Sequence, residues 1–408
     1  MKCRHCAAPL SLPLIDLGTA PPSNAYLRPN QLNAPERWYP LRVLVCTRCW
    51  LAQTEDFAQA DELFDADYAY FSSFSSTWLA HAEAYVTTMV QRLGLGPTSH
   101  VVEVAANDGY LLQYVRGRNI PCLGIEPTAS TAAAARAKGI EIVQDFFGRE
   151  LATRLRDEGK AADLTAANNV LAHVPDINDF VAGFAILLKP DGVATFEFPH
   201  LQRLIEERLF DTIYHEHYSY LSLTAVDTIF RNNGLTVFDV EDLPTHGGSL
   251  RVYAQRADTG QRPRQETVDV VLERERQAGL TNVASYAGLQ REAERIKHDL
   301  LAFLIAERRA GRKVGAYGAA AKGNTLLNWA GVRADLLPWV ADRNPSKQGK
   351  LMPGSRIPIV DEDRLHCERP DTILILPWNL RDEITAQLGY ARQWGARFAT
   401  AVPRLLDQ

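Results

Sequence analysis

Short apolar strands alternate with helical patterns over residues 100–197, and this alternation constrains the fold more than any other feature of the sequence. The predicted strands cover residues 100–104, 122–126, 140–143, 163–165 and 192–197. Strands that alternate with helices at this spacing form a parallel, doubly wound sheet, and such sheets bind ligands at the carboxyl ends of their strands. The sequence therefore predicts an α/β fold with a Rossmann-like centre.

The length of the chain, 408 residues, predicts more than one domain, because a single domain commonly holds roughly 100–200 residues. We predict a small metal-binding domain over residues 1–73 and a central α/β domain over residues 74–259. A second Rossmann-like α/β domain is predicted over residues 260–408. An apolar share of 46% and a charged share of 23% indicate that all three parts fold.

The charge and hydropathy patterns exclude two classes of partner. A formal net charge of -5 argues against a nucleic-acid partner, since that binding depends on Lys and Arg neutralising phosphates. No apolar run approaches the roughly 18 residues that span a bilayer, and the polar N-terminus does not resemble a signal peptide. We therefore expect a cytoplasmic protein without a nucleic-acid or membrane partner. We also expect a monomer or weak homo-oligomer, although neither pattern bears on that state.

Two C-x2-C pairs lie near the N-terminus, Cys3 with Cys6 and Cys46 with Cys49. Zinc prefers four soft ligands in a tetrahedron, and each pair directs two thiolates at one ion. We predict one zinc ion held by all four cysteines, with a redox-active dithiol or free thiols as the alternatives. Four protein ligands leave no position for water or substrate, so the predicted zinc is structural.

The loop after the first central strand indicates which cofactor the sheet binds. A dinucleotide fold would carry G-x-G-x-x-G here, but this chain has only Gly109, which disfavours NAD. Glu126 ends the second strand, where a carboxylate can accept hydrogen bonds from two ribose hydroxyls. Asp145 and Phe146 follow the third strand and suit an adenine. The order of these residues along the chain is stronger support than any one of them.

A long polar and aromatic insertion follows the fifth strand, from Phe198 to Tyr220, and contains Tyr214, His215, Glu216 and His217. Long loops at this edge of a sheet commonly carry function. A metal site is disfavoured, because His215 and His217 are two residues apart rather than four. A structural hydrogen-bonded cluster remains an alternative to acid-base chemistry by histidine and tyrosine.

The C-terminal part begins with a charged helical region, residues 273–309, and a new strand, residues 313–318. The turn that follows leads into Lys322 and Asn324 at the start of a helix, where backbone amides and an ammonium group can hold a diphosphate. Asp342 and Lys347 lie in a polar loop after the next strand. A tight turn with a surface lysine is the alternative.

The motifs together resemble one known family, the three-domain sugar C-methyltransferases of deoxysugar biosynthesis. The resemblance covers nearly the whole chain. It rests on the paired C-x2-C knuckles and on residues 103–113, 214–217, 245–251 and 317–324. The family usually has glycine where this chain has Ala105. The methyl group of Ala105 narrows the space beside the cofactor.

The resemblance implies an S-adenosylmethionine-dependent methyltransferase acting on a nucleotide-linked keto sugar, typically of thymidine diphosphate. The central domain would bind the methyl donor, and the C-terminal domain would bind the sugar nucleotide. By resemblance the cofactor site contains Glu103, Asn107, Gly109, Glu126, Asp145 and Asn168. Phe146 is added to this site because of its place beside Asp145. His217 would be the base, with Glu216, Tyr214 and Tyr68 beside the sugar, and His200, Lys322, Asn324, Asp342 and Lys347 would bind the substrate.

Carbon methylation itself demands a particular substrate. Carbon is a poor nucleophile unless a neighbouring ketone stabilises the carbanion, so a 4-keto-6-deoxy sugar methylated at C3 is the natural expectation. A non-catalytic sugar-nucleotide-binding module and an oxidoreductase or epimerase remain the alternatives. The missing dinucleotide glycines count against the oxidoreductase.

Overall fold

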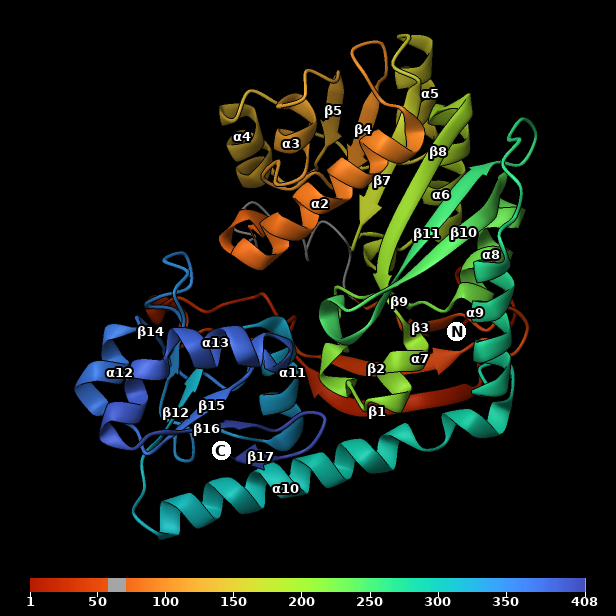
Figure 1. Cartoon of the computed structure of the whole chain (residues 1–408). Coiled ribbons are helices and arrows are strands. Elements are labelled where there is room, and N and C mark those ends of the chain that lie inside the picture. Colours follow the sequence, from red (N-terminus) through yellow and green to blue (C-terminus); the bar gives the residue numbers. More distant parts are fainter. Residues whose placement is uncertain (58–70, 408) are drawn as a thin grey trace.

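The computed structural model describes residues 1–57 and 71–407, and these contain three β-sheets with helices around them (Figure 1). The predicted α/β class, with a small N-terminal part and two Rossmann-like parts, is confirmed. Tyr68 lies outside the described residues.

The N-terminal sheet is antiparallel and has the order β1-β2-β3-β9. Its first three strands come from the cysteine-bearing segment: β1 (Leu12–Ala20), β2 (Tyr39–Val45) and β3 (Ala52–Thr54). The fourth, β9 (Ser219–Tyr220), comes from the insertion that carries His217. Ala52 pairs with Tyr220 and Gln53 with Ser219, so the insertion is hydrogen-bonded to the N-terminal sheet.

The central sheet has seven strands in the order β10-β11-β8-β7-β4-β5-β6. Its parallel strands are β4 (Val101–Val104), β5 (Cys122–Ile125), β6 (Glu141–Val143), β7 (Ala162–Asn168) and β8 (Leu188–Pro199). The two remaining strands, β10 (Leu235–Leu243) and β11 (Ser249–Arg256), run antiparallel beside β8. Its helices are α2 (Ser76–Leu93), α3 (Leu112–Arg116), α4 (Ala129–Ala137), α5 (Arg149–Asp157), α6 (Ile177–Leu187) and α8 (Leu223–Asn232). The short helix α7 (Leu201–Glu206) belongs instead to the core that includes β1 and β2.

The C-terminal sheet has the order β14-β13-β12-β15-β16-β17. Its strands are β12 (Val314–Tyr317), β13 (Val340–Ala341), β14 (Ile359–Val360), β15 (Thr372–Ile375), β16 (Arg397–Thr400) and β17 (Leu406–Asp407). Its helices are α11 (Ala321–Ala330), α12 (Asp363–Glu368) and α13 (Arg381–Gln387).

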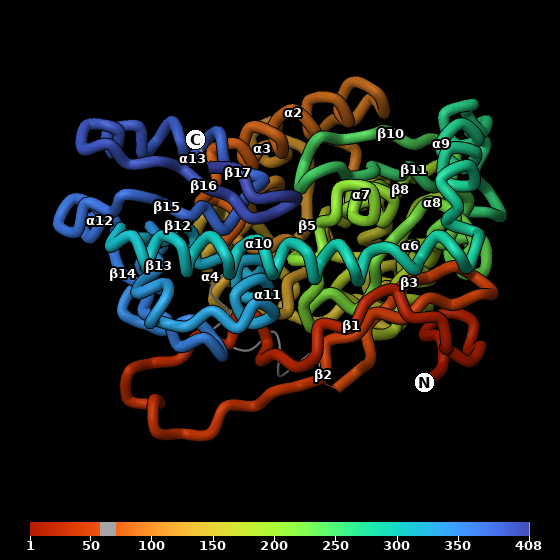
Figure 2. The backbone as a smooth tube through the Cα atoms, turned by 90° about the horizontal axis from the view of Figure 1, so that it is seen from below, coloured from red at the N-terminus to blue at the C-terminus, as the bar shows by residue number. Residues whose placement is uncertain are grey.

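The charged region before this sheet forms two helices rather than one. These are α9 (Glu266–Gln277) and α10 (Leu289–Arg309), and the break between them contains Gly279 at φ +83°. Val268 and Val271 of α9 belong to the core of the central sheet, whereas α10 runs beneath both β1 and the C-terminal sheet (Figure 2). The core of the central sheet thus includes residues beyond the predicted domain boundary between residues 259 and 260.

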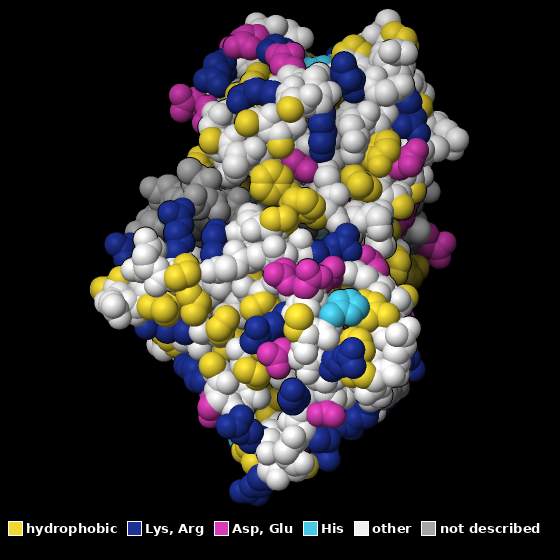
Figure 3. Space-filling view, turned by 90° about the vertical axis from the view of Figure 1, so that its left-hand side faces the viewer, with side chains coloured by type: hydrophobic (Ala, Val, Ile, Leu, Met, Phe, Trp, Pro, Cys, Tyr) yellow, Lys and Arg dark blue, Asp and Glu magenta, His cyan; other side chains and the backbone are white. Residues whose placement is uncertain are grey.

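The exposed surface carries charges of both signs. On the face in Figure 3, Lys and Arg side chains are interspersed with Asp and Glu. Within the described part of the chain, no helix combines the length and the apolarity that crossing a membrane requires.

Candidate active site

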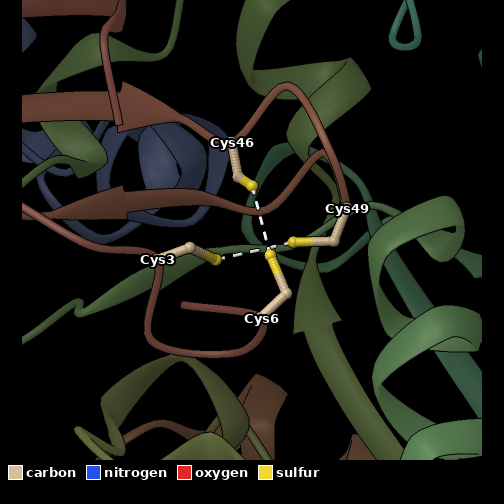
Figure 4. Close-up of side chains that lie close together, drawn as sticks. All are labelled: Cys3, Cys6, Cys46 and Cys49. Atoms are coloured by element: carbon tan, nitrogen blue, oxygen red, sulfur yellow. Dashed lines mark hydrogen bonds between the residues drawn. The ribbon is translucent and has the colours of Figure 1, made fainter. Parts of the chain in front are cut away.

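The four N-terminal cysteines converge on one point, as the sequence predicted (Figure 4). Their sulfur atoms all lie within 4.8 Å of one another, and Cys3 Sγ lies 3.5 Å from Cys49 Sγ. Zinc–sulfur bonds of about 2.3 Å place tetrahedral sulfurs about 3.8 Å apart, so the cluster fits a zinc ion. Gln53 Nε2 donates to Cys3 Sγ at 3.3 Å, which helps to stabilise a thiolate there.

His5 is not a fifth candidate ligand, because its ring is engaged elsewhere. His5 Nδ1 lies 2.7 Å from Asn178 Oδ1, and Asn178 Nδ2 donates to the His5 carbonyl oxygen at 2.9 Å. These contacts dock the first cysteine knuckle on the start of α6.

The zinc-bearing sheet also supports the insertion that carries His217. Thr54 Oγ1 donates to the His217 carbonyl oxygen at 3.1 Å, and Thr54 N donates to the Tyr218 carbonyl oxygen at 3.1 Å. The sequence analysis named Tyr68 as the residue of this domain beside the sugar. The β3–β9 pairing adds a second connection, between this domain and the segment that carries His217.

The loop after β4 takes an unusual backbone path at the carboxyl edge of the central sheet. Ala105, Asn107 and Gly109 have φ values of +60°, +49° and +76°. Glu126, at the end of β5, holds this loop: its Oε2 accepts from Asn107 N at 2.9 Å, and its Oε1 accepts from Thr128 N and from Thr131 Oγ1. A carboxylate oxygen can accept about two hydrogen bonds, so Oε2 keeps capacity for a ribose hydroxyl.

Two buried side chains lie beneath and beside this loop. Glu103 is 1% exposed, and burial raises the pKa of its carboxyl group well above the usual value. A neutral carboxylic acid can donate a hydrogen bond as well as accept one. Asn168, at the end of β7, has a buried Oδ1 without a hydrogen-bond partner among the described residues. Such an atom is satisfied when a polar ligand occupies the edge of the sheet.

Asp145 and Phe146 follow β6 at the far end of the same edge. Asp145 is paired with Arg154 at 3.3 Å, and the Phe146 ring is 52% exposed. An exposed ring next to a strand end is available to a planar group such as an adenine. The residues along β4, β5, β6 and β7 therefore fit a nucleoside-bearing ligand with a polar tail.

The insertion holds His217 with one ring nitrogen fixed. His217 Nδ1 lies 2.8 Å from the Thr212 carbonyl oxygen, which can only accept, so Nδ1 carries the proton and Nε2 of the neutral ring is a free base. Tyr214 packs against this ring with centroids 3.9 Å apart, and His173 lies at 4.7 Å. The three rings are partly exposed, so a ligand can reach them.

The surroundings keep His217 in its basic form at neutral pH. Burial, the neighbouring His173, and the charges of Lys322 and His246 together lower its pKa well below the usual value. His173 is itself held by donation from Nδ1 to the Glu216 carbonyl oxygen at 2.8 Å, and burial lowers its pKa to about 4. Both imidazoles are therefore neutral at pH 7.

The two residues before His217 face the N-terminal domain. His215 Nε2 donates to the Pro40 carbonyl oxygen at 3.2 Å, which is a structural contact. Glu216 Oε1 accepts from both Asn24 N and Asn24 Nδ2 at 3.1 Å, and burial raises its pKa. Glu216 thus links the insertion to the N-terminal segment and is 1% exposed.

Several cluster residues carried no assigned role in the sequence analysis. His246 has φ +55°, and its Nε2 lies 3.4 Å from Asn169 Nδ2. Trp78 on α2 contacts His246 with centroids 5.4 Å apart and stacks on His81 at 4.8 Å. His81 Nε2 reaches Glu197 Oε2 at 2.8 Å. The motif at residues 245–251 contains His246, but nothing in the sequence connects it with α2.

Lys322 approaches the same cluster from the C-terminal domain. Its Nζ donates to Asn379 Oδ1 at 2.8 Å and lies 4.6 Å from the centroid of the Trp378 ring. Trp378 Nε1 donates in turn to Asp211 Oδ2 at 2.8 Å. Burial raises the pKa of Asp211 to about 7, although the Lys322 charge opposes this rise. Beside the Trp378 ring lies a cavity of about 440 Å³.

The other predicted substrate residues make their observed contacts outside the His217 cluster. Asn324 is fully buried within α11. Asp342 accepts from Ala319 N at 2.7 Å, and Lys347 Nζ donates to the Ala319 carbonyl oxygen at 2.8 Å. His200 is 1% exposed, and its Nε2 lies 2.7 Å from Glu275 Oε1, so its observed partner is a buried carboxylate.

Comparison with known proteins gives three family matches along the chain. Residues 3–64 match a zinc binding domain, residues 78–240 a methyltransferase domain, and residues 244–403 a C-methyltransferase C-terminal domain. The C-methyltransferase NovU of Streptomyces niveus is 32% identical over 405 residues, which cover 98% of this chain and 95% of that protein.

Two of the solved structures that match cover less than half of this chain, with low TM-scores. Magnesium protoporphyrin IX methyltransferase from Synechocystis with bound SAM is 15% identical, with a TM-score of 0.34, covering 44% of this chain and 79% of that one. An S-adenosylmethionine-dependent methyltransferase from Clostridium acetobutylicum is 10% identical, with a TM-score of 0.36, covering 45% and 92%.

The full-length relative and the three matched domains confirm the family expected from the sequence, the enzyme class with its S-adenosylmethionine cofactor, and the zinc-binding domain. The chain belongs to the C-methyltransferase family.

Proposed function

We propose that this enzyme methylates C3 of a 4-keto-6-deoxy sugar linked to a nucleoside diphosphate, thymidine diphosphate in particular. One observation carries the proposal: His217 presents an unprotonated Nε2 to a cluster that a ligand can reach. A carbon next to a ketone is a substrate that needs such a base. The full-length similarity to a C-methyltransferase supports carbon as the acceptor atom.

The methyl donor site proposed here lies along the carboxyl edge of the central sheet. Asn107, Gly109 and Glu126 would hold the donor, with Glu103, Asn168, Asp145 and Phe146 around it. When bound, S-adenosylmethionine supplies an electrophilic methyl group. The left-handed loop after β4 exposes backbone groups to this edge, and Glu126 fixes the loop in place.

The proton transfer uses residues of the insertion. His217 Nε2 removes the C3 proton, while Thr212 holds Nδ1 and so fixes the plane of the ring. Tyr214 packs against the imidazole and limits its rotation. Glu216 ties the insertion to Asn24. Tyr68 remains a proposed sugar contact from the N-terminal domain. Precise placement of base and acceptor supplies much of the acceleration.

The sugar nucleotide would enter from the C-terminal domain. Lys322, Asn324, Asp342 and Lys347 line or support the turn after β12, and His200 starts the insertion. We retain all five as proposed substrate residues, with the monomer or weak homo-oligomer as the functional form. The non-catalytic binding module is less favoured, because a binding module has no need of a neutral imidazole with a free Nε2.

The test is incubation with thymidine-diphosphate 4-keto-6-deoxyglucose and S-adenosylmethionine, read by mass spectrometry for the gain of one methyl group. His217→Ala should lower turnover at least about 100-fold, since general bases contribute about that much or more. Its affinity for the methyl donor should stay within about twofold, because His217 lies outside the proposed donor site. His298→Ala, on the exposed face of α10, is the matched control and should be fully active.

Two outcomes would contradict the proposal. If no keto sugar nucleotide in a panel gains a methyl group, the substrate class is wrong. If His217→Ala retains near-normal turnover, another residue is the base.

A further inference from the structure

Lys322 is a cation placed among groups that take part in proton transfer. It is the second residue of α11, and its ammonium lies against the Trp378 ring. Within the described residues its one hydrogen bond goes to Asn379 Oδ1, and no carboxylate oxygen lies within ion-pair distance. A largely buried cation without a paired anion is costly, and a ligand with negative charge would offset this cost.

Two hydrogen bonds fix Lys322 relative to the base. Thr325 Oγ1, one turn along α11, donates to the Ile213 carbonyl oxygen at 2.8 Å. Trp378 Nε1 donates to Asp211 Oδ2 at 2.8 Å. Ile213 and Asp211 flank Thr212, whose carbonyl oxygen holds His217. The ammonium and the imidazole are therefore positioned by the same short segment, although they belong to different domains.

The electrostatic coupling agrees with this placement. The Lys322 charge lowers the pKa of His217 and also the pKa of His246. Burial lowers the pKa of Lys322 itself, and the Asp211 carboxylate opposes that change. The charge of Lys322 thus acts on both imidazoles.

We propose that Lys322 binds the keto oxygen of the sugar and stabilises the enolate oxyanion that His217 generates, rather than binding the diphosphate. This inference rests on the proposed function. It changes the role of Lys322 from substrate anchor to catalytic residue and makes Asp211, Asn379 and Trp378 its positioning residues.

The neighbours of Lys322 suit a single oxyanion better than a diphosphate. They are neutral imidazoles, an aromatic ring and a carboxyl group, and none adds positive charge. The backbone of Ala319, in the turn before α11, is also engaged by the protein. Ala319 N donates to Asp342, and the Ala319 carbonyl oxygen accepts from Tyr26 Oη at 2.6 Å and from Lys347 Nζ at 2.8 Å.

The step balances without any further reactant. His217 Nε2 takes the C3 proton and becomes imidazolium. The electron pair of the C3–H bond forms the C3=C4 double bond, and the carbonyl π pair moves to the oxygen. The resulting oxyanion lies against the Lys322 ammonium, which strengthens its interaction as charge develops.

Exchange of the C3 proton isolates this step from methyl transfer. The full enzyme is incubated in D2O with thymidine-diphosphate 4-keto-6-deoxyglucose and S-adenosylhomocysteine, and C3 deuteration is followed by NMR. Lys322→Met should slow the exchange about 100-fold or more, as loss of an oxyanion donor commonly does. Lys297 on α10 makes a similar contact, with its Nζ 4.4 Å from the centroid of the Trp329 ring on α11, so Lys297→Met is the control and should exchange normally.

The affinity for thymidine diphosphate shows whether Lys322 binds the diphosphate or the enolate oxyanion. If Lys322 serves the enolate, Lys322→Met should change this affinity by less than about threefold, and the same measurement shows that the variant is folded. A loss of tenfold or more with unchanged exchange would assign Lys322 to the diphosphate and overturn the inference.

The pH profile of exchange gives a second readout that a structural role would not change. His217 must be neutral to act, so the acid limb follows its lowered pKa. Its ring is faced by His173, His246, Lys322, Tyr214 and Tyr220. Removing the Lys322 charge should raise the His217 pKa and shift the acid limb to higher pH.

An unshifted limb together with normal exchange would refute the role of Lys322 alone. Absence of both exchange and methylation in the wild type would instead refute the proposed function.

Discussion

The central and C-terminal sheets hold the turn after their first strand in the same way. In each, the first strand of the unit ends in a left-handed turn, and an acid at the end of the neighbouring parallel strand holds that turn by one backbone amide. In the central unit Glu126 accepts from Asn107 N at 2.9 Å. In the C-terminal unit Asp342 accepts from Ala319 N at 2.7 Å.

The two turns differ in what happens to their remaining polar groups. After β4, Glu126 Oε2 keeps acceptor capacity and Asn168 Oδ1 on the adjacent strand end has no partner among the residues described. After β12, the Ala319 carbonyl oxygen accepts from Tyr26 of the N-terminal segment and from Lys347. The central turn therefore keeps polar atoms for a ligand, whereas the Ala319 peptide of the C-terminal turn is bound to other parts of the protein.

The largest effect that this comparison predicts is on methyl-donor affinity in Glu126→Ala. Removing the carboxylate releases the Asn107 loop and deletes the proposed ribose acceptor. A hydrogen bond to a charged group contributes about 1.5–3 kcal/mol, so donor affinity should fall about 10-fold to 100-fold. Isothermal titration with S-adenosylmethionine measures this directly.

Asp342→Ala is the matched change in the other unit. It should leave donor affinity within about twofold and instead raise the KM for the sugar nucleotide, because the acid supports the turn that precedes Lys322. Equal donor affinities in the two variants would show that the units are not functionally distinct.

A smaller effect is expected on stability when Gly318, in the C-terminal turn, is replaced by alanine. Gly318 has φ +87°, and an added Cβ would lie 2.5 Å from Pro377 Cδ. The left-handed conformation costs about 1–2 kcal/mol for alanine, and the overlap adds to it, so Gly318→Ala should destabilise the protein by at least about 2 kcal/mol. Urea unfolding measures the change.

Gly331→Ala separates the cost of the left-handed conformation from the cost of the overlap with Pro377. Gly331 has φ +71°, but no atom lies within 4 Å of its added Cβ. Its cost should therefore be the conformational part alone. A loss as large as that of Gly318→Ala would mean that the Pro377 contact contributes nothing.

The same comparison shows what sequence alone could reveal. The cysteine knuckles, the strand–loop–helix order and the acid at Glu126 are local patterns, because each depends on residues close together in the chain. The two-residue strand β9 has no such pattern, since it exists only by pairing with β3. The support that the zinc domain gives to His217 therefore could not be predicted.

The contact partners of individual side chains were also hard to predict, because they depend on residues far apart in the sequence. His246 and Trp78 meet although α2 and the turn before β11 are far apart in sequence. His200 stands at the start of a polar insertion, yet its ring is directed to Glu275 on α9. In both cases tertiary packing, rather than local spacing, decides the partner.

The smallest and most diagnostic effect concerns Ala105, which has φ +60° at the point where the family usually has glycine. The left-handed conformation costs alanine about 1–2 kcal/mol, whereas glycine adopts it freely and loses about 0.5–1 kcal/mol through the entropy of the unfolded chain. Ala105→Gly should thus stabilise the protein by about 0.5 kcal/mol, seen as a higher urea midpoint. The adjacent Ala106→Gly is the control: Ala106 is fully buried and has no positive φ, so the change should destabilise the protein. If both variants lose stability, the turn after β4 is not strained, and the Cβ of Ala105 stabilises it through packing instead.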